Sequence, residues 1–403
     1  MVEYNITMKN VVIIIVDILL LIILSAVVGY FIIGDKLFDA IGIPNPFATN
    51  NEAVAEDYSL SQEELLSKSQ AIVDAALREA TLKAEEEARL NAKTTLMFTG
   101  DVMIGNQIQN YYNAGGIDSL ISEELRSAMN EADITMINNE FCFSTRGEKA
   151  ANKQYTFRTD PSYVSILKEL GVDIAGLANN HVLDFGKDAL VDTFDLFDSE
   201  GIYYTGAGRN LNDSAKLVTI TVNDKQIGFL AASRVIPFGS WAAGSGTGVF
   251  SMYDPSELIA RVTSAKEECD LVFVMVHWGI EHTDVLQSYQ ISNGHDLIDA
   301  GADGIIGMHS HCLQPIEYYK GKPIFYGMGN FIFSQTEGPA LAVRLTIDAD
   351  GMMTPQLFAT RETDGRTYAL SGDAASEVYN YLMSISDTVY IDSNGYMSER
   401  ISQ

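Results

Sequence analysis

Short apolar runs that end in polar, metal-binding residue types restrict the fold of this 403-residue chain more than any other feature. Five such runs cover residues 95–98, 134–137, 174–178, 271–276 and 304–307. Apolar runs of this length are typical of strands buried inside a sheet. Ligand sites collect at the ends of strands in a covered sheet. The pattern therefore predicts buried strands whose ends bring polar side chains to a common site.

Three of the six histidines stand at two of these strand ends. His277 follows the run 271–276, and both His309 and His311 follow the run 304–307. A His-x-His pair also has a structural interpretation, because two imidazoles on one face of an edge strand can simply hydrogen-bond to their neighbours. The pair predicts a metal site only if further ligand types gather with it.

Further ligand types follow the three upstream runs, namely Asp101, Glu140 and Asn180. Taken singly, Asp101 can be a turn residue and Asn180 can cap a helix, but their repeated position after strands favours a shared site. Oxygen ligands combined with imidazole suit one or two divalent ions, with Mn, Fe, Zn and Mg left open. A structural zinc site built on cysteine is not indicated, because the chain contains no Cys-x-x-Cys pair.

The motifs around these residues occur in a recognisable order. They are Phe98-Thr-Gly-Asp-Val-Met103, Asn138-Asn-Glu140, Leu177-Ala-Asn-Asn-His181 with Asp184, His277-Trp-Gly-Ile-Glu281, Gly307-Met-His-Ser-His311 and Gly329-Asn-Phe331. Over residues 95–347 they resemble the poly-γ-glutamate capsule synthesis protein CapA family, which is itself similar to the calcineurin-like metallophosphoesterases. The resemblance implies an α/β (α+β) fold, a four-layer sandwich of two mixed β-sheets flanked by helices.

The same resemblance implies a site for two divalent ions. It would place Asp101 and His311 on the first ion, Asn180, His277 and His309 on the second, and Glu140 between the two. His181 would donate a proton to a leaving group. Met103 stands where the phosphoesterases usually carry a second histidine for the first ion, and a thioether is a poor ligand for hard cations.

The chemistry implied by this arrangement depends on how many ions bind. Two ions would lower the pKa of a bridging water toward about 7 and hold a phosphate ester for in-line attack, and His181 would protonate the departing oxygen. One ion could still polarise a carbonyl group or hold a carboxylate. A metal-dependent hydrolase is therefore one expectation among several.

Three residues are candidates for contacts with substrate. The resemblance implies that Glu281 belongs to the rim of the pocket, whereas the residue alone would be an exposed loop acid. Arg158 can bind a carboxylate or phosphate in a bidentate manner, or it can form a surface ion pair. Asn138 stands beside the predicted bridging carboxylate and is the third candidate.

The amino-terminal region predicts a membrane anchor. Residues 11–33 are almost entirely apolar, and at about 1.5 Å per residue they would extend over roughly 34 Å, enough to cross a bilayer. The run favours an uncleaved signal anchor with the soluble domain outside the cytoplasm. Asp17 within it would cost roughly 2.5 to 3.5 kcal/mol at the bilayer centre. It is either hydrated near one interface or paired with a membrane subunit of a polyglutamate synthase complex.

The chain divides into four predicted segments. Residues 1–34 are assigned to a short cytoplasmic tail and the transmembrane anchor, and 35–93 to a loop and an acidic helical stalk. Residues 94–370 are assigned to the CapA-like domain, and 371–403 to a helix and a peripheral tail. Within the domain, Asn223-Asp224 and Asp350-Gly351 predict two β-hairpins.

The formal net charge of −28 excludes nucleic acid as an expected partner, because nucleic acid binding needs basic patches. An anionic polymer or phosphate ester would have to be bound locally, through metal ions or an arginine. Among the three cysteines, Cys142 and Cys312 lie close in sequence to Glu140 and His311, and the sequence leaves their pairing open.

Three functions remain open. The first is a membrane-anchored CapA-like protein of poly-γ-glutamate biosynthesis or export that carries a divalent-metal site. The second is an active phosphoesterase that acts outside the cytoplasm. The third is a non-catalytic scaffold subunit of a membrane synthase complex.

Overall fold

The computed structural model describes residues 70–71, 74–83, 93–334 and 337–400. The chain divides into two units, residues 1–83 and 84–403. In the first unit the described residues are helical and exposed, in the segment where the sequence predicts a stalk helix. The predicted anchor over 11–33, with Asp17, lies outside the described residues. Among the described helices, none has the length and apolar character needed to span a bilayer.

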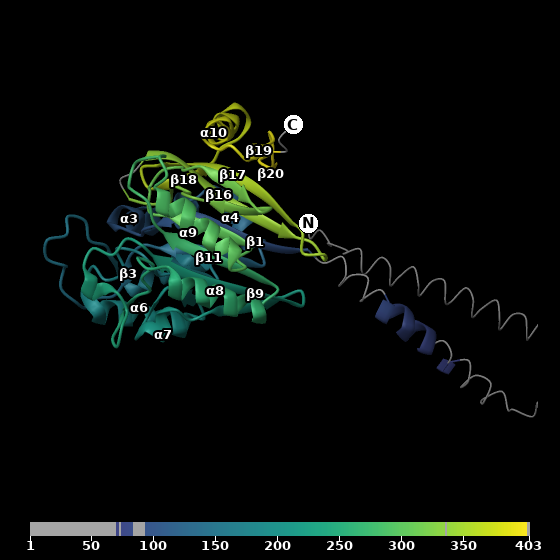
Figure 1. Ribbon diagram of the computed structural model, residues 1–403, viewed down its shortest axis with the longest axis horizontal. Helices are drawn as coiled ribbons and strands as arrows, with labels where there is room; N and C mark the ends of the chain where they lie inside the picture. Colours follow the sequence, from purple (N-terminus) through teal and green to yellow (C-terminus); the bar gives the residue numbers. More distant parts are fainter. Residues whose placement is uncertain (1–69, 72–73, 84–92, 335–336, 401–403) are drawn as a thin grey trace, which may run out of the picture. The chain divides into compact units, whose positions relative to one another are not determined.

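An eight-stranded mixed sheet forms one half of the second unit (Figure 1). Its strand order is β18-β17-β16-β1-β2-β5-β6, and β15 also pairs with β1. The parallel part consists of β1 (Thr94–Val102), β2 (Ile134–Asn139), β5 (Ile174–Gly176), β6 (Tyr203–Thr205) and β15 (Asn330–Ile332). The antiparallel part consists of β16 (Glu337–Ile347), β17 (Met353–Thr363) and β18 (Arg366–Ala369).

A six-stranded mixed sheet forms the other half, in the order β13-β14-β12-β11-β9-β8. Its parallel strands are β9 (Lys225–Ser233), β11 (Leu271–His277), β12 (Gly304–Met308) and β14 (Lys322–Phe325). Its two edge strands are antiparallel to their neighbours, β8 (Val218–Val222) and β13 (Ile316–Tyr319).

The two sheets face each other across the main core. The rings of Phe98 in β1 and Phe273 in β11 lie 5.5 Å apart between centroids. Side chains alternate along β11, so Phe273 belongs to this inner core while Val272 and Val274 belong to a second core. Burying each such apolar side chain contributes roughly 1.5 to 3 kcal/mol. The apolar runs are therefore buried on both faces, as predicted.

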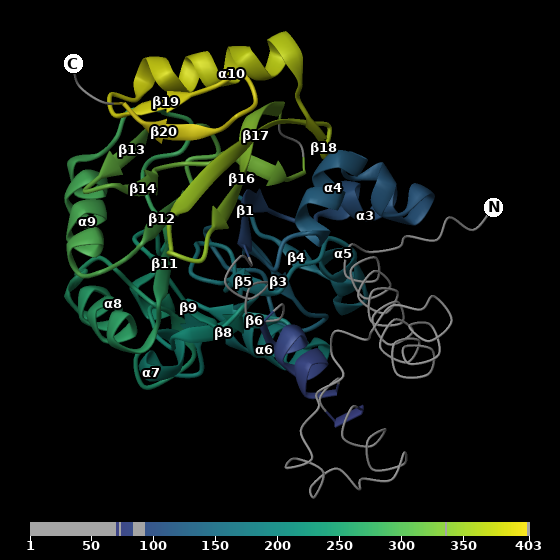
Figure 2. The same ribbon diagram turned by 90° about the vertical axis from the view of Figure 1, so that its right-hand side faces the viewer.

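Helices cover the outer faces of both sheets. The second core lies under α8 (Ser256–Glu268) and α9 (Ser288–Asp299), which contact the six-stranded sheet (Figure 2). On the eight-stranded sheet, Arg344 of β16 donates a hydrogen bond to the carbonyl of Ala128 in α4 (Glu123–Asn130), at 3.2 Å. The domain thus consists of mixed sheets with flanking helices.

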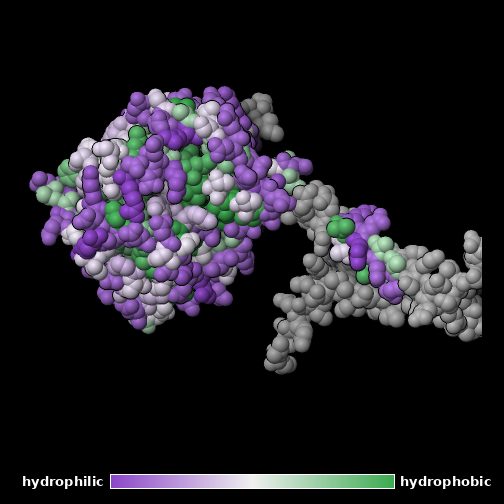
Figure 3. All heavy atoms as spheres, turned by 90° about the horizontal axis from the view of Figure 1, so that it is seen from below, coloured by the Kyte–Doolittle hydropathy of each residue, from purple (hydrophilic) through white to green (hydrophobic). Residues whose placement is uncertain are grey.

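Further helices and two-residue strands connect the strands of these sheets. They are α3 (Asn106–Gly115), α5 (Val164–Glu169), α6 (Gly186–Glu200), α7 (Leu211–Ser214), β3 (Cys142–Phe143), β4 (Arg158–Thr159), β7 (Ala207–Gly208) and β10 (Gly248–Val249). On the face of the molecule in Figure 3, hydrophilic side chains dominate and hydrophobic ones gather in a limited area.

The carboxyl-terminal segment differs from the predicted helix and peripheral tail. The helix is present as α10 (Gly372–Ile385), but the residues after it form a hairpin, β19 (Val389–Ile391) and β20 (Met397–Glu399). Val389 and Met397 are buried in the main core. This end of the chain is therefore part of the domain, and its strands are too short for an alternating pattern to reveal them.

Candidate metal centre

The predicted ligands meet at one edge of the two facing sheets. The strands β1 and β2 are parallel, as are β11 and β12, so each pair has its carboxyl ends on the same side. Ligand atoms lie within 4.8 Å of one another in three groups: Asp101, Glu140 and His311; Glu140, His277 and His309; and Glu281, His309 and His311. We call Asp101, Glu140, Asn180, His277, His309 and His311 the ligand cluster.

Glu140 occupies the centre of the ligand cluster. Its Oε1 lies 3.8 Å from Nε2 of His277 and 3.9 Å from Nε2 of both His181 and His311. The side chain is fully buried, and within the described chain this oxygen accepts no hydrogen bond. Burial, followed by the charge of Asp101, raises the pKa of Glu140 well above its usual value. An unpartnered buried carboxylate oxygen is costly, and a bound cation would remove that cost.

The inner half of the ligand cluster consists of Asn180, His277 and His309. Nε2 of His277 donates to Oδ1 of Asn180 at 2.8 Å. The centroids of the His277 and His309 rings lie 4.7 Å apart. Nδ1 of each histidine is buried without a partner among the described residues. Burial, followed by the neighbouring histidines, lowers the pKa of His309 to about 3 and that of His277 well below its ordinary value. Both imidazoles are therefore neutral at pH 7, the form that binds metals.

The outer half consists of Asp101 and His311. Oδ2 of Asp101 accepts a hydrogen bond from the backbone N–H of His309 at 3.2 Å and lies 3.5 Å from Nδ1 of His311. That Nδ1 donates to Oδ1 of Asn330 at 2.8 Å, which leaves Nε2 facing Glu140. Met103 is buried two residues after Asp101, just beyond the end of β1. With Glu140 shared, this half supplies fewer ligand groups than the inner half.

Asn138, which the sequence suggested as a substrate contact, hydrogen-bonds to two carboxylates of the ligand cluster. Its Nδ2 donates to Asp101 at 2.7 Å and to Glu140 at 3.3 Å. Its Oδ1 accepts a hydrogen bond from Nδ2 of Asn179 at 3.0 Å. Both ends of the amide are thus engaged within the protein.

His181 is held beside the ligand cluster by an acid and a lysine. Its Nδ1 lies 2.7 Å from Oδ2 of Asp184 and 2.8 Å from Nζ of Lys153, which itself pairs with Oδ1 of Asp184 at 2.5 Å. Phe157 stacks on the imidazole with a centroid distance of 4.2 Å. These contacts direct Nε2 toward Glu140, the position expected of a proton donor. Sequence reasoning missed Lys153, because a single lysine in a polar loop belongs to no pattern.

The backbone around the histidines is strained. His309, His311 and His282 have φ values of 91°, 52° and 60°, in the left-handed region. Such conformations cost roughly 1 to 3 kcal/mol each and persist where the surroundings fix them, often at functional sites. Close approach is also required at Gly100, where a Cβ atom would lie 2.1 Å from the carbonyl oxygen of Gly329. This contact brings the end of β1 against Gly329, which directly precedes Asn330 at the start of β15.

The other two predicted substrate contacts differ in placement. Arg158 is exposed, donates to the carbonyl of Arg146 at 2.8 Å and lies over the ring of Phe185 at 4.1 Å. Arg158 thus contacts a neighbouring loop and is not part of the ligand cluster, and its contact with substrate stays a prediction. Glu281 is also exposed, but its carboxylate does reach His309 and His311.

The cysteines do not pair. Cys142, Cys269 and Cys312 are free thiols. Burial raises the pKa of Cys142 to about 12, so this thiol is neutral at pH 7.

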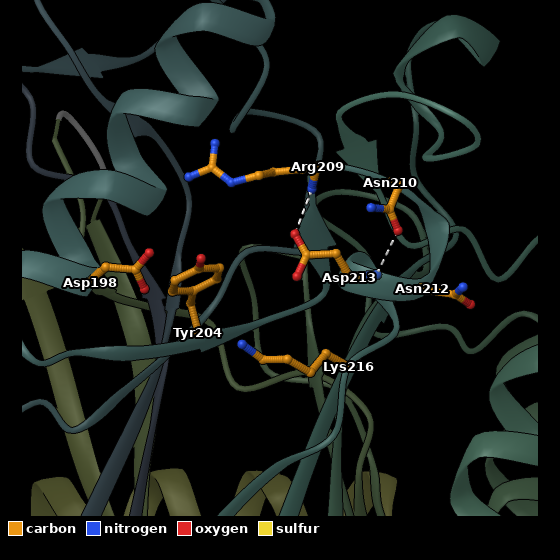
Figure 4. Close-up of a pocket in the computed structure, with 7 residues that line it drawn as sticks. All are labelled: Asp198, Tyr204, Arg209, Asn210, Asn212, Asp213 and Lys216. Carbon is orange, nitrogen blue, oxygen red and sulfur yellow. Dashed lines mark hydrogen bonds between the residues drawn. The ribbon is translucent and has the colours of Figure 1, made fainter.

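A separate surface depression of about 640 Å³ contains none of these residues. Asp198, Tyr204, Arg209, Asn210, Asn212, Asp213 and Lys216 line it (Figure 4). Several of its polar groups already contact one another. The backbone N–H of Arg209 donates to Asp213 at 2.7 Å, and that of Asp213 donates to Asn210 at 3.1 Å. It contains no imidazole, unlike the ligand cluster.

Comparison with known proteins gave a family match and several relatives. The family model described as bacterial capsule synthesis protein PGA_cap matches residues 95–335. The PGA biosynthesis protein CapA of Bacillus subtilis (strain 168) is 32% identical over 240 residues, which cover 59% of this chain and 63% of that protein. The capsule biosynthesis protein CapA of Bacillus anthracis is 32% identical over 254 residues, 61% of each chain. The chain thus spans about three fifths of the length of these relatives.

Among solved structures, a novel phosphatase of Mycoplasma pneumoniae is similar with a TM-score of 0.45 and 14% identity. The similarity covers 73% of this chain and all of that one.

Proposed function

Because the chain belongs to the bacterial capsule synthesis protein PGA_cap family, we propose that it acts in poly-γ-glutamate biosynthesis or export and binds divalent metal ions. The names of the two Bacillus relatives support the pathway. The metal site rests mainly on one observation, the buried and unpartnered Oε1 of Glu140 surrounded by three imidazoles within 3.9 Å.

Two ion positions that share Glu140 fit this donor set. Asn180, His277 and His309 would hold the inner ion, and Asp101 and His311 the outer one. The mixture of oxygen and neutral imidazole ligands suits Mn, Fe, Zn or Mg. When bound, such ions lower the pKa of a coordinated water and clamp anionic oxygens. They would also give a strongly acidic protein a local attraction for an anionic polymer.

The residues of the chain would support this chemistry in distinct ways. Asn138 orients the two carboxylates through its hydrogen bonds to both. Asp184 and Lys153 fix the imidazole of His181. His181 can therefore hold a proton at Nε2 on the side that faces Glu140, and release it to a leaving oxygen.

Phosphoester hydrolysis is the second candidate function, and the placement of His181 favours it. Two facing mixed sheets with ligands at their carboxyl edge also match the arrangement expected of a calcineurin-like metallophosphoesterase. A non-catalytic scaffold remains the third alternative. Metal content and aryl phosphate turnover of the purified full chain distinguish these functions. Bound metal together with turnover supports the phosphoesterase, and the absence of both supports the scaffold.

The proposed location is the cell membrane, with residues 11–33 as a single anchor and the domain outside the cytoplasm. Asp17 would pair with a membrane subunit of the synthase complex. Coprecipitation of that complex with wild type and Asp17→Leu tests this pairing. We expect less partner recovery with the leucine, and undiminished recovery would contradict it.

Polymer production tests the role of the site itself. We expect His277→Ala and His309→Ala to reduce poly-γ-glutamate in the producing cell while the protein remains present in the membrane. Immunoblotting controls for protein level. A normal amount of polymer from both variants would show that the site is not needed for polymer production.

A further inference from the structure

The loop between β11 and α9 is exposed at Glu281, but hydrogen bonds to the protein interior hold its backbone in place. The backbone N–H of His282 donates to the carbonyl of Ser310 at 2.8 Å. Two buried glutamines continue this support: Nε2 of Gln290 donates to Gln314 at 2.9 Å, and Nε2 of Gln314 donates to the carbonyl of Thr283 at 2.9 Å. The backbone on both sides of Glu281 is thus held at the mouth of the ligand cluster.

The carboxylate of Glu281 lies at ligand distance from the cluster. One of its oxygens and one nitrogen each from His309 and His311 all lie within 4.8 Å of one another. Two protein atoms bound to one ion at about 2.0 to 2.2 Å can be at most roughly 4.4 Å apart. Because the Glu281 side chain is exposed, rotation about its side-chain bonds can move the carboxylate by the few tenths of an ångström that are needed.

The outer ion position has room for this group. Its own ligands are Asp101, His311 and the shared Glu140, and the nearby Met103 offers only a thioether. Hard divalent cations prefer carboxylate oxygen to sulfur. Glu281 would be a fourth ligand and a third carboxylate at the outer position, and would therefore strengthen it more than the inner one.

The charge of Glu281 argues for a cation rather than for an anionic substrate. The carboxylates of Glu281 and of the buried Glu140 each lie within 4.8 Å of a ring nitrogen of His309, so their negative charges repel each other. A γ-glutamyl chain or a phosphate ester would meet the same repulsion. A divalent ion between the carboxylates would turn the repulsion into attraction.

We propose that Glu281 is a metal ligand which completes the outer ion position from the solvent side. The inference rests on the proposed divalent-metal binding and changes the role of Glu281 from substrate contact to ligand. The exposed loop then contributes to the ion site directly, and ion binding orders its carboxylate.

Manganese titration of the full chain in detergent tests the proposal. We compare wild type with Glu281→Gln, which keeps the shape but weakens the ligand, by calorimetry and by electron paramagnetic resonance of Mn²⁺. The expected result is a loss of at least about tenfold in the affinity of the weaker ion, with the tighter ion unchanged. Asp284→Asn is the matched control, because it removes one charge from the same loop and keeps an acceptor for the Tyr381 hydroxyl.

The outcomes separate this inference from the proposed function. Wild type that binds no Mn²⁺, Zn²⁺ or Fe²⁺ would defeat metal binding itself, and with it the inference. Wild type and Glu281→Gln that bind two ions equally would overturn the role of Glu281 alone. An equal loss in Asp284→Asn would show a general charge effect and would also overturn it.

Discussion

The two halves of the ligand cluster differ in how firmly their ligands are held. In the inner half, His277 ends β11, His309 follows β12 directly, and both are buried. In the outer half, His311 depends on a hydrogen bond to Asn330, and the proposed fourth ligand comes from an exposed loop. Ligands at strand ends need little rearrangement, so the inner ion should bind more tightly. The difference teaches that buried histidines fix one ion position, whereas the other relies partly on less buried side chains.

The largest loss of metal binding is expected from substitution of Glu140, which the two halves share. Glu140→Gln should remove both ions, since losing a shared ligand should exceed the roughly 10- to 100-fold cost of losing a supporting residue. Metal content of the purified protein measures this. Loss of one ion only would place Glu140 in one half rather than between them.

The same variant also tests the buried charge. Because burial raises the pKa of Glu140, the neutral glutamine should not destabilise the metal-free protein by more than about 1 kcal/mol. Urea unfolding in the presence of a chelator measures the difference. A loss of several kcal/mol would contradict this account of Glu140.

A pair of histidine substitutions separates the halves. His277→Ala should reduce binding of the tighter ion by about 100-fold or more, whereas His311→Ala should affect only the weaker ion. Calorimetric titration with Mn²⁺ resolves the two events. If His311→Ala also removed the tighter ion, the two positions would not be separate.

A smaller effect is expected from pH in the metal-free protein. An unfolded histidine titrates near pH 6.5, but burial lowers the pKa of His309 to about 3. Below about pH 6.5 the unfolded state therefore binds a proton that the native state does not. The free energy of unfolding consequently decreases as the pH is lowered. The slope is up to about 1.4 kcal/mol per pH unit for this residue, down to about pH 3.

His309→Gln isolates this contribution. Its unfolding free energy should depend less on pH between 6.5 and 5 than that of wild type, by up to about 1.4 kcal/mol per unit. Fluorescence of the buried Trp278 can follow the unfolding in urea. Parallel pH dependence in the two proteins would mean that His309 titrates normally.

Much of this arrangement was predictable from residue patterns. Four of the five apolar runs lie wholly in strands β1, β2, β11 and β12, and the run 174–178 begins in β5, which ends at Gly176. A strand buried on both faces needs a continuous apolar run. The Asn223-Asp224 turn also forms as predicted, with φ values of 49° and 62° that match a hairpin. Short-range patterns of this kind predict local structure, because the residues that determine it are neighbours in the sequence.

Contacts between distant segments were not predictable in the same way. Lys153 reaches His181 from a polar loop, and the hairpin β19–β20 joins the core although its strands have three residues each. The hydrogen-bond partners of Asn138 and Arg158 were not predictable either, because tertiary packing sets them. Glu281 was placed at the rim only through the resemblance to a family.

The most direct test of the central claim is a calorimetric titration of the metal-free full chain with Mn²⁺. The account predicts two binding events that share Glu140, with affinities at least about tenfold apart and both lost in Glu140→Gln. No binding of Mn²⁺, or two events that survive Glu140→Gln, would contradict it.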